Sequence, residues 1–178
     1  MRRRHTREEY LDLAGRVREA IPNATLSTDI IVGFPGETAE DFDQTLSLMK
    51  AVQYHSVFSF KYSVRPNTLA SKRLPDDVSA DEKTARIVAL QSLQREIQTG
   101  LHERLVGTTH EVLVDHTSKR REAEVAGRTT GNTIVNFPIP GDGGNSRAED
   151  WIGRTVRVTI RRAGPYSVWG EVVGTEPR

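Results

Sequence analysis

The chain has 178 residues, no cysteine and a net charge of +1. This length is enough for one large domain or two small ones, each with its own core. Acidic and basic residues balance in both halves, so any basic surface that binds nucleic acid must be local. The lack of cysteine excludes disulfides, thiolate metal sites, iron–sulfur ligation and cysteine nucleophiles within this chain.

Nothing in the sequence indicates a membrane protein or a secreted one. No apolar run approaches the ~18 residues of a membrane span. The start, MRRRHTREEY, is basic, but no apolar segment follows it as in a secretory signal. We therefore expect a cytoplasmic protein.

The first 62 residues predict helix, strand, helix and strand, in that order. Thr6 opens a capping-box pattern before the first helix, and Thr38 is placed to cap the second. The β-branched segment 25–34 predicts a strand buried on both faces, and 56–62 predicts another strand. This order is typical of βα units in a parallel sheet. Because two strands do not close a sheet, we expect the end of a larger α/β domain whose earlier strands precede this chain.

A different pattern follows in the second half of the chain. A capping box at 79–82 opens a long predicted helix, and five short alternating segments follow after Gly107. Glycine, proline, asparagine and aspartate separate these segments, with a longer loop predicted at 138–150. The pattern predicts a small antiparallel β-barrel of the OB-like kind that often binds RNA. The expected domains are 1–105 and 106–178.

The segment IIVGFPGET, residues 30–38, is the first candidate site. Ligands of α/β folds bind at the carboxyl ends of the strands, where this segment lies. Gly33 and Gly36 would let a ligand approach the backbone, and free N–H groups at the following helix could meet its polar atoms. A purely structural corner explains the same residues, and the residues alone leave both explanations open.

Other polar residues give weaker indications of chemistry. Asp29 and Glu37 could be acid/base or metal-binding carboxylates, whereas Asp41 is explained by the dipole of the helix it begins. No residue pattern indicates a catalytic nucleophile. The histidines show no metal-ligand spacing: His5, His55, His102, His110 and His116.

Basic and aromatic residues of the second half could contact RNA phosphates and bases. Phe137 is equally explained by core packing, and residues 119–121 by an exposed hairpin tip. Trp169 alternates with Val168, so one of the two must point outward. The candidates are Lys119, Arg120, Arg121, Arg128, Phe137, Arg161, Arg162, Tyr166 and Trp169.

Four motifs occur together in this chain: RRRHTREEY, STDIIVGFPGET, FSFKYSVRPNTLA and GRTTGNTIVNF. In this order they resemble the C-terminal part of radical SAM methylthiotransferases, and the tail with AGPYSVWGEVV resembles the TRAM domain of that family. The resemblance implies the distal βα units of a partial TIM-like barrel, followed by a TRAM barrel. It implies addition of a methylthio group to isopentenylated adenosine beside the tRNA anticodon, using S-adenosylmethionine and two 4Fe-4S clusters.

The resemblance also implies binding residues. The segment Tyr62–Thr68 would lie at the same active-site rim as the glycine turn. Residues beside S-adenosylmethionine would be Asp29, Gly33, Phe34, Pro35, Gly36 and Glu37. Residues that contact the tRNA would be Arg65, Lys119, Arg120, Arg121, Arg128 and Asn132.

Some residues depart from the family pattern. The cluster cysteines are absent, so we expect this chain to be inactive without the N-terminal portion that supplies them. Asn67 stands where glycine is usual, and Thr133 where a basic residue is common. Two alternatives remain: methylthiolation of an aspartate on a ribosomal protein, and a non-catalytic RNA-binding module.

Overall fold

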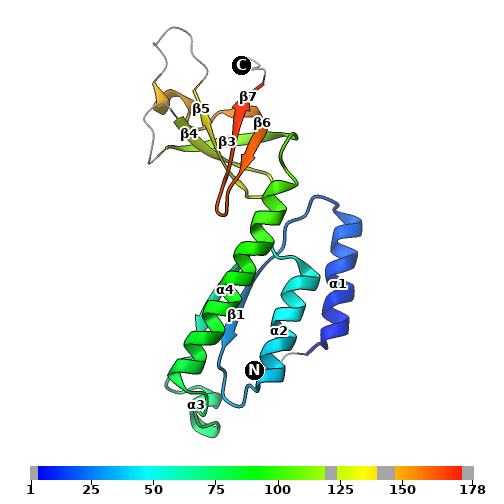
Figure 1. The fold of residues 1–178 in the computed structure, drawn as a ribbon, viewed down its shortest axis with the longest axis vertical. Coiled ribbons are helices and arrows are strands. Elements are labelled where there is room, and N and C mark those ends of the chain that lie inside the picture. The colour runs from blue at the N-terminus through cyan, green and yellow to red at the C-terminus, as the bar shows by residue number, and fades with distance from the viewer. Residues whose placement is uncertain (1–3, 119–123, 140–146, 174–178) are drawn as a thin grey trace. The chain divides into compact units, whose positions relative to one another are not determined.

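The computed structural model describes residues 4–118, 124–139 and 147–173. They fall into two compact units, Met1–Gln98 and Thr99–Arg178 (Figure 1). The division lies inside helix α4, Ala80–Glu103. The domain boundary after residue 105 stays a prediction.

Side-chain caps begin the helices of the N-terminal unit. Thr6 and Thr38 cap their helices, as predicted, and each forms a capping box with the residue three positions later. Ser79 accepts the N–H of Glu82 at 3.1 Å at the start of α4. Thr68 caps a short helix that the sequence analysis did not predict. The elements are α1 (Arg7–Ala20), β1 (Ser27–Val32), α2 (Ala39–Val52), β2 (Ser56–Lys61), α3 (Leu69–Arg73) and the first part of α4.

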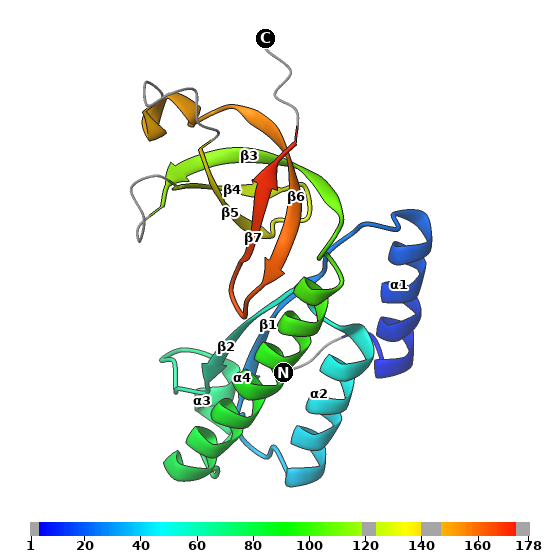
Figure 2. The same cartoon turned by 45° about the horizontal axis from the view of Figure 1, so that its top comes forward.

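Strands β1 and β2 pair in parallel, as predicted, with Ile31 opposite Phe60. Helix α4 covers one face: Gln91 donates to Ser59 at 3.2 Å, and α4 runs along both strands in Figures 1 and 2. On the other face Phe58 and Phe60 are 60% and 55% exposed. Asp29 of β1 is exposed and Ile31 is only partly buried, so the prediction that β1 is buried on both faces is wrong. Among the described elements, only the short helix α3 meets this face, at the pocket described below.

The C-terminal unit is a closed barrel with the strand order β3-β4-β5-β7-β6. The five strands were all predicted, but β5 and β7 pair in parallel, so the prediction of an antiparallel barrel is wrong for that pair. Five strands cannot alternate in direction around a closed ring, so one neighbouring pair must be parallel. The elements are β3 (Thr109–Thr117), β4 (Glu124–Thr129), β5 (Ile134–Pro138), η1 (Ala148–Trp151), β6 (Thr155–Ala163) and β7 (Val168–Val172).

Alternate strand residues fill the barrel interior. Val112, Val135, Phe137 and Ile160 are fully buried there. Of the two explanations for Phe137, core packing is confirmed. Val168 is 1% exposed in the same core, which directs its neighbour on β7 outward.

Candidate functional site

The turn after β1 depends on two glycines in the left-handed region. Gly33 has φ +68° and Gly36 has φ +80°. A side chain at either position would be strained, since the left-handed region costs an L-residue roughly 1–2 kcal/mol. At Gly33 a Cβ would also lie 2.3 Å from Cγ of Lys83, so the stem of this lysine fills the space that glycine leaves.

The side chain of Glu37 stabilises the turn to which it belongs. Its Oε2 accepts the N–H of Gly33 at 2.6 Å and lies 2.5 Å from a guanidinium nitrogen of Arg86 on α4. Arg86 is 5% exposed and also pairs with Glu82. The carboxylate of Glu37 therefore neutralises a buried cation and fixes the turn at the same time.

Residues just before α4 hold the other half of the turn. The N–H of Gly36 donates to Oδ1 of Asp77 at 2.8 Å, and Nζ of Lys83 lies 2.5 Å from Oδ1 of Asp76. The N–H groups of both turn glycines are thus bound by protein carboxylates. The N–H groups expected to be free are those at the start of α2, and two of them, on Thr38 and Asp41, are bound within the capping box.

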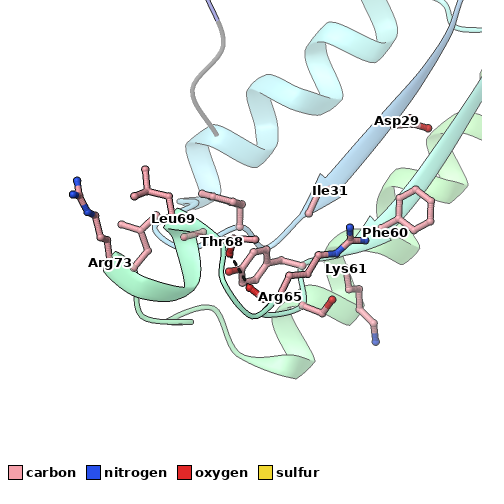
Figure 3. Close-up of a pocket in the computed structure, with 13 residues that line it drawn as sticks. Asp29, Ile31, Phe60, Lys61, Arg65, Thr68, Leu69 and Arg73 are labelled. Carbon is pink, nitrogen blue, oxygen red and sulfur yellow. Dashed lines mark hydrogen bonds between the residues drawn. The ribbon is translucent and has the colours of Figure 1, made fainter.

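A pocket of about 730 Å³ lies beside this turn, at the carboxyl ends of the two strands (Figure 3). Three residues predicted to bind ligands line it together: Asp29, Phe34 and Arg65. The other predicted cofactor residues, Gly33, Pro35, Gly36 and Glu37, are not among the residues that line it.

The pocket wall is mostly apolar and aromatic. The rings of Phe34 and Tyr62 meet edge to face, with their centroids 5.1 Å apart. The carboxylate of Asp29 is the acidic group of the lining. A few polar groups in an apolar concave wall of this volume are typical of a small-molecule site.

Sequence reasoning missed several lining residues, among them Phe60, Leu69 and Arg73. The alternation of SVFSFKY places Phe58 and Phe60 on one face of β2, and this signal could have shown that the face is apolar. Leu69 and Arg73 belong to α3, whose only sequence signal is the cap Thr68.

Asn67 takes the left-handed conformation, with φ +66°. Asparagine tolerates this region better than most residues, so it can replace the usual glycine. The chain turns here: both the backbone N–H and Oγ1 of Thr68 donate to the carbonyl of Arg65, at 3.4 and 2.9 Å.

Asp41 lies outside the pocket and serves as a capping residue. Hydrogen bonds from the backbone and side chain of Thr38 lower the pKa of the Asp41 carboxyl. The helix-dipole explanation given for Asp41 is consistent with this position at the start of α2.

Among the described residues, no group of three or more His, Asp or Glu side chains could hold a metal ion.

On the barrel, the structure brings together two predicted RNA-contact residues. Arg128 donates to Oδ2 of Asp115 at 3.1 Å and to Oδ1 of Asn132 at 2.9 Å. Thr133, in place of a basic residue, is 5% exposed. Lys119, Arg120 and Arg121 lie outside the described residues.

A second basic group, Arg161 and Arg162, lies on β6. Arg161 pairs with Glu171 at 2.9 Å. Cζ of Arg162 lies 4.4 Å from the centroid of the Trp169 ring, whose Nε1 donates to Glu124 at 3.1 Å. Trp169 is thus the residue of the Val168–Trp169 pair that points outward.

None of the helices in the described part of the chain is long and apolar enough to cross a membrane.

Comparison with known proteins matches both units. Residues 1–49 match the radical SAM superfamily, and residues 103–173 match the TRAM domain. Relatives named tRNA-2-methylthio-N(6)-dimethylallyladenosine synthase align over nearly the whole chain. The chain resembles the C-terminal part of these synthases.

The alignments cover most of this chain but about a third of each relative. The synthase of Clostridium botulinum (strain Okra) is 44% identical over 173 residues, which are 97% of this chain and 36% of the relative. The synthase of Symbiobacterium thermophilum is 43% identical over 97% of the chain, and that of Actinobacillus pleuropneumoniae 43% over 99%; each alignment covers 35% of the relative. The resemblance seen in the four motifs is thereby confirmed.

Proposed function

We propose that the chain is the C-terminal portion of a tRNA methylthiotransferase that modifies isopentenylated adenosine next to the anticodon. The observation that carries this proposal is the 44% identity to the synthase over 97% of the chain. The pocket at the strand ends supports it, because Asp29, Phe34 and Arg65 come together where an α/β fold binds its ligand.

S-adenosylmethionine fits the chemical character of this pocket. Aromatic rings such as Phe34 and Tyr62 can pack against an adenine or face a sulfonium, and the carboxylate of Asp29 can accept hydrogen bonds from hydroxyl or ammonium groups. When bound, S-adenosylmethionine supplies the methyl group and the radical that the family resemblance implies. In this proposal Gly33, Pro35, Gly36 and Glu37 act indirectly, by fixing the backbone that carries Phe34.

The 4Fe-4S clusters do not fit the residues of this chain. Cluster ligation needs cysteine thiolates, and the sequence contains no cysteine. We assign both clusters to an N-terminal portion of the same protein, and we expect the chain alone to be inactive.

The barrel is proposed to hold the tRNA. Its match to the TRAM domain and the tRNA-modifying relatives support this role. Arg128 and Asn132, with the basic segment 119–121, are the proposed contacts on the barrel. Arg65, in the N-terminal unit, is a further proposed contact. The site of action would be the cytoplasm.

Deletion of the gene in its host tests the proposed activity. Mass spectrometry of tRNA nucleosides should show isopentenyladenosine without its 2-methylthio group, and the complete gene should restore that group. Unchanged nucleosides would contradict the proposal. Loss of a methylthio group from an aspartate of a ribosomal protein would instead support the alternative substrate.

A further inference from the structure

The outer face of the barrel carries a stacked arginine and tryptophan that the proposed function leaves unassigned. Trp169 points outward from β7, while Val168 is 1% exposed and faces the core. Arg162 is the register partner of Trp169 on β6 and lies over the indole, 4.4 Å from its centroid. This spacing is that of a cation–π contact.

The indole lies across a neighbouring strand. Nε1 of Trp169, on β7, donates to Oε1 of Glu124, on β4, at 3.1 Å. Strand β5 lies between β7 and β4, so the ring crosses β5 near Asn136, the register partner of Trp169. The ring is thus held at Nε1 by Glu124 and contacted by the guanidinium of Arg162. Glu124 is 9% exposed, so its carboxylate fixes the ring and presents little charge to solvent.

The charge of Arg162 is not neutralised by a carboxylate among the described residues. Two other barrel arginines are neutralised in this way: Arg128 pairs with Asp115, and Arg161 pairs with Glu171. Arg162 is exposed, and its described contact is the indole. It therefore presents a flat, charged guanidinium to solvent in a position that Trp169 has already fixed.

We propose that the guanidinium of Arg162, stacked on Trp169, is a platform on which an unpaired RNA base stacks. This inference rests on the proposed RNA-binding role of the barrel. Proteins recognise single-stranded RNA by stacking its bases on aromatic rings and guanidinium planes. The indole holds the guanidinium in place beforehand, so little side-chain freedom is lost on binding. The positive charge adds attraction to the neighbouring phosphates.

The test uses the 178-residue chain and a fluorescein-labelled RNA hairpin with an unpaired loop, followed by fluorescence anisotropy. Arg162→Ala should bind the hairpin roughly tenfold more weakly, the loss expected for one stacked base. Arg162→Lys should also bind more weakly than wild type, because lysine keeps the charge that attracts phosphates but has no plane on which a base can stack. Arg157→Ala is the matched control, an exposed arginine on the same strand opposite Glu111; its affinity should stay within about twofold of wild type.

Tryptophan fluorescence gives a second, independent measurement. The chain has two tryptophans, so Trp151→Phe leaves Trp169 as the sole tryptophan reporter. The hairpin should quench or shift the emission of Trp169, whereas the same hairpin with an abasic loop should change it much less.

The outcomes separate this inference from the function on which it rests. Wild-type affinity in Arg162→Lys would mean a phosphate contact and would overturn the stacking platform. Wild-type affinity in Arg162→Ala would overturn it as well, while RNA binding by the barrel would stand. A wild-type chain that does not bind the hairpin even at low salt would contradict the proposed RNA binding itself.

Discussion

The carboxylate of Glu37 lies 2.5 Å from the guanidinium of Arg86, although 49 positions separate the two residues in the chain. Both side chains are largely buried, at 12% and 6% exposed. The same carboxylate accepts the N–H of Gly33. This pair therefore links the turn beside the pocket to helix α4.

Glu37→Gln should destabilise the N-terminal unit by about 2 kcal/mol, because Arg86 would lose one of its two carboxylates while staying buried. Urea unfolding followed by far-UV circular dichroism measures the free energy of unfolding of the N-terminal unit, since most helical residues belong to that unit. Both tryptophans lie in the C-terminal unit, so their fluorescence should follow an unchanged transition. Glu40→Gln, at an exposed carboxylate in the first turn of α2, is the control, with less than ~0.5 kcal/mol expected. Equal effects of the two substitutions would refute the structural role of Glu37.

The two turn glycines should differ in their tolerance of alanine. Gly36→Ala should cost about 1 kcal/mol, because the left-handed backbone is strained but the space beside it is open. Gly33→Ala should cost roughly 2–3 kcal/mol, because the added Cβ would also collide with the stem of Lys83. Urea unfolding followed by circular dichroism compares them directly. A Gly33→Ala chain as stable as Gly36→Ala would show that Lys83 moves aside freely.

The stability of α2 should depend on the ionisation of Asp41. Hydrogen bonds to Thr38 lower its pKa from the ordinary value of 3.8 in the folded chain. A lowered folded pKa contributes stability above pH ~4, and that contribution is lost as the pH falls through the folded pKa. Asp41→Asn should therefore reduce the pH dependence of unfolding below pH ~4, as measured by thermal melts across that range. An identical pH profile in both proteins would contradict this assignment.

The uncovered face of β1 and β2 should make the isolated chain self-associate. Phe58 and Phe60 are 60% and 55% exposed on this face, and contiguous apolar surface of this kind promotes association. Phe58→Asp combined with Phe60→Asp should lower the weight-average mass in sedimentation experiments at high concentration. Val106→Asp, at an exposed apolar residue of the C-terminal unit, should not change it. If the wild type, the double variant and Val106→Asp all self-associate equally, another surface must cause the association.

Local signals explain why much of the fold was predictable. Thr6 and Thr38 cap their helices through neighbours three residues away, so the sequence pattern contains both partners. The five barrel strands alternate inward and outward residues, and that period of two is visible in the sequence. The short helix α3 escaped prediction because its five residues give no periodic pattern.

The candidate site was predicted less completely, because its contacts join distant segments. The sequence places two glycines and Glu37 at the end of a strand. No sequence pattern indicates that Asp77, 41 positions away, would accept a hydrogen bond from the N–H of Gly36. Phe60 and Arg73 join Asp29 in one pocket only after β2 and α3 have packed beside β1.

The sequence by itself determined the order of the strands and the three long helices, the lack of cluster ligands and the place of the glycine turn, because each follows from local chemistry or composition. Only the tertiary structure decided that the glycine N–H groups are already bound and that one face of the two-stranded sheet is uncovered. It also decided that Trp169 lies across β5 beneath Arg162. These features depend on side chains and backbones that meet through folding, and no local pattern encodes such meetings.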